Sequence, residues 1–470
     1  MNLLYNFLTT LYLIISIKSI KFDYSKIIKY NLPQNKINII KNINGFYGLI
    51  GPNINLNENF EKDKNIKMYD FFSNDGIVQG VFFNNGEITF INSIIKTEKF
   101  LFEQQYGKIP RNPLIIFLFM FLNKLNNTKK LPNMNGFANT ALLNIDKNLY
   151  ALYEMDQPYL LNLDFNNKKI NTIQKIESND FKHFSGHSKY NENSKSIETI
   201  EYYMDKNIVN FYELDNNFSV KNTANFQFNY IPLIHDFYSV NDKIYLIDMP
   251  IEIDYNKVLI KKMPIQLNKN KETNIYIYDK INQKKETYIY NYGIFLFHYG
   301  NIIETKNYIK IFAPIYDNFD FSDLNIQGKY RMILINKNSK EVSIIKNKDL
   351  ELYNLDFPIK YDDKIILYNK EKNIINGFII CKDLQIIKKI IFTDRNIKGE
   401  HNIIEINNKK YLIFFNEKEG KGENKNYISI LDLDLDLDLD LCLDKINEYI
   451  IDIEIPEKIK FGFHSIFVKQ

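Results

Sequence analysis

The protein has 470 residues, and its 45% hydrophobic and 25% charged residues supply enough apolar side chains to bury a substantial core. Its formal net charge is only +3, and the lysines are scattered among acidic residues, so nucleic acid is not an expected partner. The two cysteines, Cys381 and Cys442, lack metal-ligand spacing and are expected to be buried packing residues.

The N-terminal segment, residues 1–22, is dominated by the apolar run Leu3–Ile17. A run of this length is more typical of a signal peptide than of a membrane span, which needs about 20 residues. We therefore expect a signal-peptide-like or anchor segment, with an endomembrane, secretory or organelle (plastid-like) location. A buried N-terminal strand or helix is the alternative. Secretory entry would make the Asn126–Thr128 and Asn217–Ser219 sequons glycan sites.

Short runs rich in Ile, Val, Phe, Tyr and Thr begin at about residue 45 and alternate with turn sequences. Lys243–Met249 and Tyr308–Ile315 are typical runs, and Asn74–Gly76 and Asn84–Gly86 are typical turns. Such alternation predicts many antiparallel hairpins and an all-β fold. Length leaves the number of domains open, because large all-β folds often use this many residues as one unit.

Two segments depart from this alternation of short strand-like runs and turns. Pro113–Leu122 is continuously apolar after a proline start signal, which predicts a helix to about Asn127 that is either buried or lies in a membrane surface. Leu431–Asp444 alternates Leu with Asp, which is typical of a half-buried strand or hairpin with a solvated acidic face. A calcium site on that acidic row is the less favoured reading, because adjacent like charges repel.

Four of the six histidines lie in or at the ends of apolar, strand-like runs, whereas His183 and His401 adjoin charged or polar residues. The four are His187, His235, His298 and His464. Each alone would most often be a hydrogen-bonded core histidine. Together they could form an all-imidazole site for iron, zinc, copper or nickel, if the fold brings distant strands to one axis.

A series of motifs follows in chain order from about Gly45 to the C-terminus, roughly nine-tenths of the chain. The segments are Gly45–Asn53, Phe71–Val81, Phe90–Thr97, Ala138–Leu142, Leu152–Tyr159, Phe184–His187, His235–Phe237, Phe297–His298 and Gly462–His464. In this order they resemble the motifs of the carotenoid cleavage oxygenases. Each motif is weak alone, but the ordered series is not expected by chance.

The resemblance implies that residues 23–470 form a single seven-bladed β-propeller, with a cap of helices and loops over a metal on its axis. It implies Fe(2+) bound by one imidazole from each of four blades. The implied ligands, which are also the catalytic centre, are His187, His235, His298 and His464. The Pro113–Asn127 helix then resembles the segments with which the family takes its substrate from a membrane. By alignment, Leu143 would lie near the open coordination positions.

Three carboxylates outside the metal ligands are also implied, each accepting the second ring N–H of a histidine and fixing its orientation. We call them the outer carboxylates; they are Glu154, Asp356 and Glu400. Asp356 is a departure, because the family normally has Glu there. The shorter side chain leads us to expect a bridging water or a less firmly held histidine.

The implied activity is Fe(II)-dependent cleavage of a conjugated double bond of a carotenoid or apocarotenoid by O2, giving aldehyde or ketone products. One alternative is a retinoid-type isomerohydrolase with the same fold. Another is a catalytically silent propeller that binds a lipid or apocarotenoid; Asp356 supports it, but the presence of all four histidines opposes it. Met155 and Asp156 replace family glycines and leave the identity of the polyene open.

Overall fold

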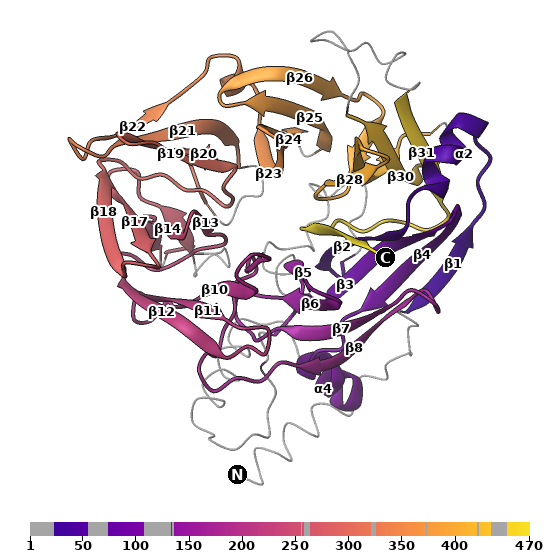
Figure 1. The fold of residues 1–470 in the computed structure, drawn as a ribbon, viewed down its shortest axis with the longest axis horizontal. Coiled ribbons are helices and arrows are strands. Elements are labelled where there is room, and N and C mark those ends of the chain that lie inside the picture. Colours follow the sequence, from indigo (N-terminus) through magenta and orange to yellow (C-terminus); the bar gives the residue numbers. More distant parts are fainter. Residues whose placement is uncertain are drawn as a thin grey trace.

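The computed structural model of the protein describes residues 23–54, 74–107, 133, 136–254, 256–257, 264–320, 326–372, 374–420, 423–433 and 449–470. Within these residues the strands form seven sheets of four or five strands and one two-stranded sheet. Figure 1 shows the seven larger sheets as blades around a common axis. The structure confirms the predicted all-β, seven-bladed β-propeller.

The first three blades, numbered in chain order, are antiparallel sheets. Blade 1 contains β1 (Tyr24–Ile28), β2 (Gly45–Pro52), β3 (Gly76–Asn84), β4 (Glu87–Ile94) and β32 (Ser465–Lys469). Blade 2 contains β5 (Ala141–Ile145), β6 (Asn148–Leu152), β7 (Tyr159–Asp164) and β8 (Lys169–Lys175). Blade 3 contains β9 (Lys189–Asn191), β10 (Ser196–Tyr203), β11 (Ile208–Leu214) and β12 (Val220–Gln227).

The other four blades complete the ring. Blade 4 contains β13 (Tyr238–Val240), β14 (Lys243–Asp248), β17 (Thr273–Asp279) and β18 (Lys284–Tyr290), with the separate hairpin of β15 (Ile251–Ile253) and β16 (Ile265–Leu267) between β14 and β17. Blade 5 contains β19 (Asn301–Glu304), β20 (Tyr308–Tyr316), β21 (Gly328–Asn336) and β22 (Val342–Ile345). Blade 6 contains β23 (Leu355–Tyr361), β24 (Lys364–Glu371), β25 (Ile374–Lys382) and β26 (Gln385–Ile391). Blade 7 contains β27 (Arg395–Ile397), β28 (Asn402–Ile406), β29 (Lys409–Lys418), β30 (Lys425–Asp432) and β31 (Ile450–Ile455).

The ring is closed within blade 1, where β32 joins the sheet formed by strands from the beginning of the chain (Figure 1). The register pairs Gly45 with Lys469 and Leu49 with Ser465, antiparallel. Because strand pairing satisfies the backbone groups of β2 and β32 together, this closure needs no covalent link.

The hydrophobic core of the described residues is divided into seven clusters, and each combines side chains from two adjoining blades. At the junction of blades 1 and 7, for example, the Tyr47 and Phe415 rings lie 5.1 Å apart. Cys381 is fully buried in the cluster between blades 5 and 6, which confirms its predicted packing role. Apolar contact between successive blades therefore holds the ring together.

Figure 1 shows the helices α2 (Gln34–Lys41) and α4 (Glu98–Tyr106) outside the ring of blades. The short 3-10 helix η1 (Leu350–Leu352) precedes β23, and its Leu350 is buried in the core cluster between blades 5 and 6. Thr97 caps α4 by accepting a hydrogen bond from the Phe100 N–H at 3.1 Å, a usual start signal for a helix. Among the described residues, no helix has the length and apolar character needed to cross a membrane.

Several predicted features lie outside the described residues. They are the N-terminal segment 1–22, the helix Pro113–Asn127 with its expected membrane contact, Cys442 and most of the Leu431–Asp444 repeat. At the described start of that repeat, Leu431 and Leu433 are buried while Asp432 is half-exposed. This pattern is the one predicted for a half-buried strand.

Candidate metal centre

The four predicted histidine ligands occupy equivalent places in four blades, just before the strand at the inner edge. His187 comes two residues before β9, His235 and His298 each come three residues before β13 and β19, and His464 directly precedes β32. Equivalent positions in a propeller face the same axis, so the fold joins residues up to 277 positions apart in sequence.

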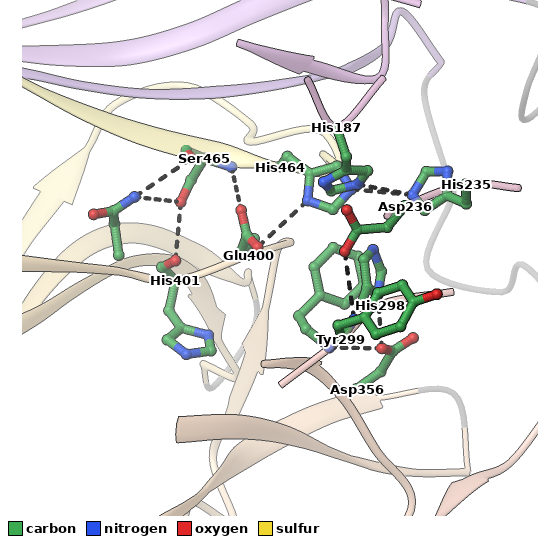
Figure 2. Close-up of polar contacts among 12 residues, drawn as sticks. His187, His235, Asp236, His298, Tyr299, Asp356, Glu400, His401, His464 and Ser465 are labelled. Atoms are coloured by element: carbon green, nitrogen blue, oxygen red, sulfur yellow. Dashed lines mark hydrogen bonds and ion pairs between the residues drawn. The ribbon is translucent and has the colours of Figure 1, made fainter. Parts of the chain in front are cut away.

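The four imidazoles converge (Figure 2). The His187 Nε2 lies 2.9 Å from the His464 Nε2 and 3.0 Å from the His235 Nε2, and the latter two atoms are 3.4 Å apart. One nitrogen from each of the four rings lies within 4.8 Å of the others. Metal–nitrogen bonds of about 2.1 Å at right angles would place neighbouring nitrogens about 3.0 Å apart, which agrees with the shorter separations.

Each outer carboxylate contacts the Nδ1 of a different histidine. The Glu154 Oε1 lies 2.8 Å from the His235 Nδ1, the Asp356 Oδ1 lies 2.8 Å from the His298 Nδ1, and the Glu400 Oε1 lies 3.3 Å from the His464 Nδ1. The carboxylates come from blades 2, 6 and 7, the three blades that supply none of the four predicted ligands. Among the described residues, no carboxylate forms such a contact with the His187 ring.

These contacts determine which ring nitrogen is free to bind a metal. A carboxylate accepts a hydrogen bond from the Nδ1–H, so the proton stays on Nδ1 and the Nε2 of the same ring presents a lone pair. Three such lone pairs converge on one point, and the buried His298 Nε2 has no hydrogen-bond partner among the described residues. Buried nitrogen lone pairs that face one another without a cation or a hydrogen-bond donor are unfavourable. Neutral imidazoles are suitable ligands for divalent iron, so the residues fit the implied metal.

The environment of the centre favours neutral imidazoles at His187 and His464, whereas at His298 burial is outweighed by the neighbouring Asp356, which raises the pKa of His298 above its ordinary value. Burial and the nearby rings of His464, His235 and His298 hold the pKa of His187 well below its ordinary value. Burial also lowers the pKa of His464, although Glu400 opposes this change. Burial would raise the pKa of Asp356, but the contact with His298 holds it below its usual value, so the carboxylate is charged.

Asp356 contacts His298 directly, and the expected bridging water is not required. A β-bulge in β23 between Asp356 and Ile359 shifts the backbone, and Phe357 adopts a left-handed φ of 51°. The Oδ1 of Asp356 also accepts the Phe357 N–H at 2.8 Å, and its Oδ2 accepts the hydroxyl of Tyr316. Backbone displacement thus offsets the missing methylene group.

Two hydroxyl groups that were not singled out from the sequence also donate hydrogen bonds to outer carboxylates. The Thr140 hydroxyl donates to the Glu154 Oε2 at 2.9 Å, and Tyr316 donates to Asp356 as described above. Thr140 lies in the Ala138–Leu142 motif, which was a usable signal, but nothing in the sequence distinguishes Tyr316. Leu143 is partly buried against the apolar cluster between blades 2 and 3, and its expected place near the open coordination positions stays a prediction.

The two remaining histidines lie outside the metal centre, next to aromatic side chains. His401 follows Glu400 in sequence, but its fully buried ring packs against Phe378 with the ring centroids 4.9 Å apart. Figure 2 shows the His401 ring turned away from the four converging imidazoles. The His183 ring lies 5.6 Å from the Tyr203 ring. Neither histidine belongs to the group that could hold a metal.

Comparison with known proteins identifies the family. The profile of the family described as "Retinal pigment epithelial membrane protein" matches residues 38–367, well over half of the chain. The chain belongs to this family, the carotenoid oxygenases. The match includes three of the histidines, Glu154 and Asp356, but stops before Glu400 and His464.

Individual relatives of carotenoid oxygenase type agree with this assignment. Carotenoid 9,10(9',10')-cleavage dioxygenase 1 of Arabidopsis thaliana is 28% identical over 128 residues, which cover 25% of this chain and only 22% of that protein. Cobalt-substituted Synechocystis apocarotenoid oxygenase has a TM-score of 0.71 at 15% identity, covering 96% of this chain and 97% of that one. Pseudomonas brassicacearum lignostilbene dioxygenase has a TM-score of 0.71 at 14% identity, covering 96% of both chains. At these identities the structures establish a shared fold.

Proposed function

We propose that the protein is an Fe(II)-dependent dioxygenase that cleaves a conjugated double bond of a carotenoid or apocarotenoid with O2. The observation that carries the proposal is the convergence of four imidazole nitrogens, three of them from rings oriented by carboxylates. The proposed ligands are His187, His235, His298 and His464. The proposed orienting residues are Glu154, Asp356 and Glu400.

The reaction needs no further co-reactant. One carbon–carbon double bond and the oxygen–oxygen bond break, two carbon–oxygen double bonds form, and each product receives one oxygen atom. Bound Fe(II) would supply the redox chemistry with O2. The two substrate carbons are oxidised and O2 is reduced, so the step is balanced without an external reductant.

The described residues contribute orientation and an apolar setting. The outer carboxylates hold three of the imidazole rings in place before a metal binds. Less side-chain entropy is therefore lost on metal binding. The Phe357 ring lies 4.8 Å from the His298 ring and 5.0 Å from the His464 ring, and the Phe297 ring lies 5.7 Å from the His235 ring. Aromatic rings beside the centre would exclude water and suit a polyene better than a polar substrate.

The names of the relatives support this choice of substrate class. One relative is a carotenoid cleavage dioxygenase and one structural neighbour is an apocarotenoid oxygenase, and both names join a conjugated substrate with oxygen chemistry. The direct contact between Asp356 and His298 removes the main support for a catalytically silent propeller. Membrane contact through residues 113–127 and a secretory or organelle location stay predictions.

The test measures iron content, O2 uptake and product masses for protein purified anaerobically with Fe(II) and supplied with carotenoids, apocarotenals and a retinyl ester. Wild type is expected to bind about one iron per chain and to form aldehydes, and His235→Ala should lose both properties. His183→Ala is the matched control, because His183 lies outside the metal group. Iron-free wild type without O2 uptake would contradict the proposal, and a retinol product without O2 uptake would favour the isomerohydrolase.

A further inference from the structure

A fourth carboxylate, Asp236, lies beside the metal centre without contacting an imidazole ring. It directly follows His235 in sequence, and its side chain is only 6% exposed. The Oδ1 lies 2.6 Å from the Nζ of Lys189 and accepts the Phe237 N–H at 2.8 Å. The Oδ2 receives the Tyr299 N–H at the longer distance of 3.4 Å (Figure 2).

The partners of Asp236 share one property: each lies one or two residues from a proposed metal ligand. Lys189 follows His187 by two positions, and Tyr299 directly follows His298. One carboxylate therefore joins the entry points of three inner strands, β9, β13 and β19, in three successive blades. A change in its position would move the backbone beside three histidines together.

The fourth ligand has a separate anchor. Ser465 directly follows His464; its N–H donates to the Glu400 Oε2 at 2.8 Å and its hydroxyl donates to the His401 carbonyl at 3.0 Å. Figure 2 shows this group to the left of the four imidazoles, away from Asp236. The backbone next to His464 is thus held by contacts that do not include Asp236, and the His187 N–H has an acceptor of its own in the Ser185 Oγ at 3.0 Å.

The Asp236 contacts are electrostatic as well as steric, because they include an ion pair with Lys189. An almost buried carboxylate is costly unless it is paired, and Lys189, whose side chain is 34% exposed, supplies the pairing charge. The Lys189 ammonium also lies 5.5 Å from the centre of the Phe237 ring. Charge-assisted hydrogen bonds are shorter and stronger than neutral ones, so the ion pair restricts both strands that it joins.

We propose that Asp236 is a positioning residue that sets the separation of His187, His235 and His298 around the metal. This inference rests on the proposed function in one respect, since it takes the four histidines as the ligands. Each outer carboxylate orients one histidine ring, whereas Asp236 links the segments of three ligands through one ion pair and two backbone hydrogen bonds.

The test uses the full-length protein in its metal-free form, titrated with Co(II) in competition with a chelator. The visible ligand-field spectrum of Co(II) reports the geometry of the ligands independently of activity. Asp236→Asn keeps the shape and an acceptor oxygen but loses the charge, and should alter the spectrum and weaken Co(II) binding by about tenfold. Lys189→Gln, a change at a partly exposed side chain, should alter both in the same direction by a smaller factor.

Asp452→Asn is the matched control. Asp452 is a carboxylate of blade 7 paired with Arg395 at 2.6 Å and Lys418 at 2.6 Å, and it is not part of the metal group. This variant should lower the unfolding temperature of the metal-free protein while leaving the Co(II) spectrum and affinity unchanged.

The outcomes separate the two proposals. Wild type that binds Co(II), with an Asp236→Asn spectrum and affinity equal to wild type or matched by Asp452→Asn, overturns the role of Asp236 and leaves the proposed function intact. Wild type that binds no Co(II) overturns the proposed function and this inference together. If Asp236→Asn does not fold, Lys189→Gln decides: an unchanged spectrum and affinity overturn the role of Asp236.

Discussion

Asp356 reaches His298 although its side chain is one methylene group shorter than those of Glu154 and Glu400. The sequence showed the substitution but not its compensation. A bulge in β23 depends on the pairing of that strand with β24, and a left-handed Phe357 cannot be recognised from residue type. The contacts of Tyr316 and Asp236 were likewise not visible in the sequence, because Asp356, Lys189 and Tyr299 lie on distant segments.

Removing the Asp356 carboxylate should weaken metal binding. In Asp356→Ala the His298 Nδ1–H and the Tyr316 hydroxyl lose their acceptor, and we expect the affinity for Fe(II) to fall about 10- to 100-fold. Asp356→Asn keeps an acceptor oxygen and should lose less. Iron retained after dialysis against graded chelator concentrations measures the effect. Tyr316→Phe is the control that leaves the carboxylate in contact with His298; equal iron retention in Asp356→Ala and wild type would contradict the prediction.

His401 should make the folded protein sensitive to acid. Burial lowers its pKa to about 4, with Glu400 opposing, whereas an unfolded histidine has a pKa of 6.5. Because the folded pKa is the lower one, the unfolded state takes up the proton first as the pH falls. The contribution of neutral His401 to the free energy of unfolding is about 3 kcal/mol. It is complete above about pH 6.5 and is lost progressively as the pH falls toward 4.

The His401→Phe variant tests this assignment. Phenylalanine suits the surroundings of Phe378 and does not titrate, so the free energy of unfolding should fall less steeply between pH 6.5 and pH 4 than in wild type. Denaturant unfolding at several pH values measures both slopes. Parallel curves for the two proteins would show that His401 is not the responsible group.

At the scale of single elements, the loop between β27 and β28 is restricted by glycine. Gly399 has a φ of +125°, and a Cβ there would lie 2.5 Å from the Gly462 carbonyl oxygen. The neighbouring Glu400 N–H donates to the Phe463 carbonyl at 3.1 Å. The loop can therefore approach the segment before His464 only without a side chain at position 399.

Gly399→Ala should destabilise the protein and weaken metal binding. The strained φ costs about 1 kcal/mol, and displacement of the Gly462 backbone adds to it while moving Glu400 away from His464. Gly86→Ala is the matched control, because its φ of +92° imposes similar strain but the nearest atom to its new Cβ is the Cγ of the flexible Lys41 side chain at 3.0 Å, and the Tyr30 hydroxyl lies at an ordinary contact distance of 3.5 Å. Thermal unfolding and iron content should separate the variants; equal losses in both would contradict the role assigned to the loop.

At the scale of the whole molecule, the sequence predicted the class of fold from hairpin periodicity, and the family resemblance supplied the number of blades. Periodicity identifies strands but not which of them meet at the axis, because that depends on ring closure between residues such as Gly45 and Lys469. The four histidines could be named as a group only through the ordered motifs. Their spacing along the chain contains no information on their convergence.

Deleting residues 465–470 should open the ring while leaving all four histidines in the chain. The deletion removes β32, exposes the inner edge of β2 and frees His464 from Ser465 and its contacts. We expect a lower unfolding temperature and an iron affinity reduced by at least about tenfold. Deletion of Gln470 alone is the control, since it leaves the β2–β32 pairing intact. Full iron binding by the shortened chain would show that closure is not needed for the centre.

The position of β32 also gives the protein an order of assembly. His187, His235 and His298 are translated well before His464, which enters the chain directly ahead of the strand that completes blade 1. A growing polypeptide therefore presents three histidines of the set while the ring is still open. The last ligand and the closing strand become available within a few codons of each other. Binding of a metal by all four histidines would therefore require the completed fold, and a prematurely terminated product would lack His464.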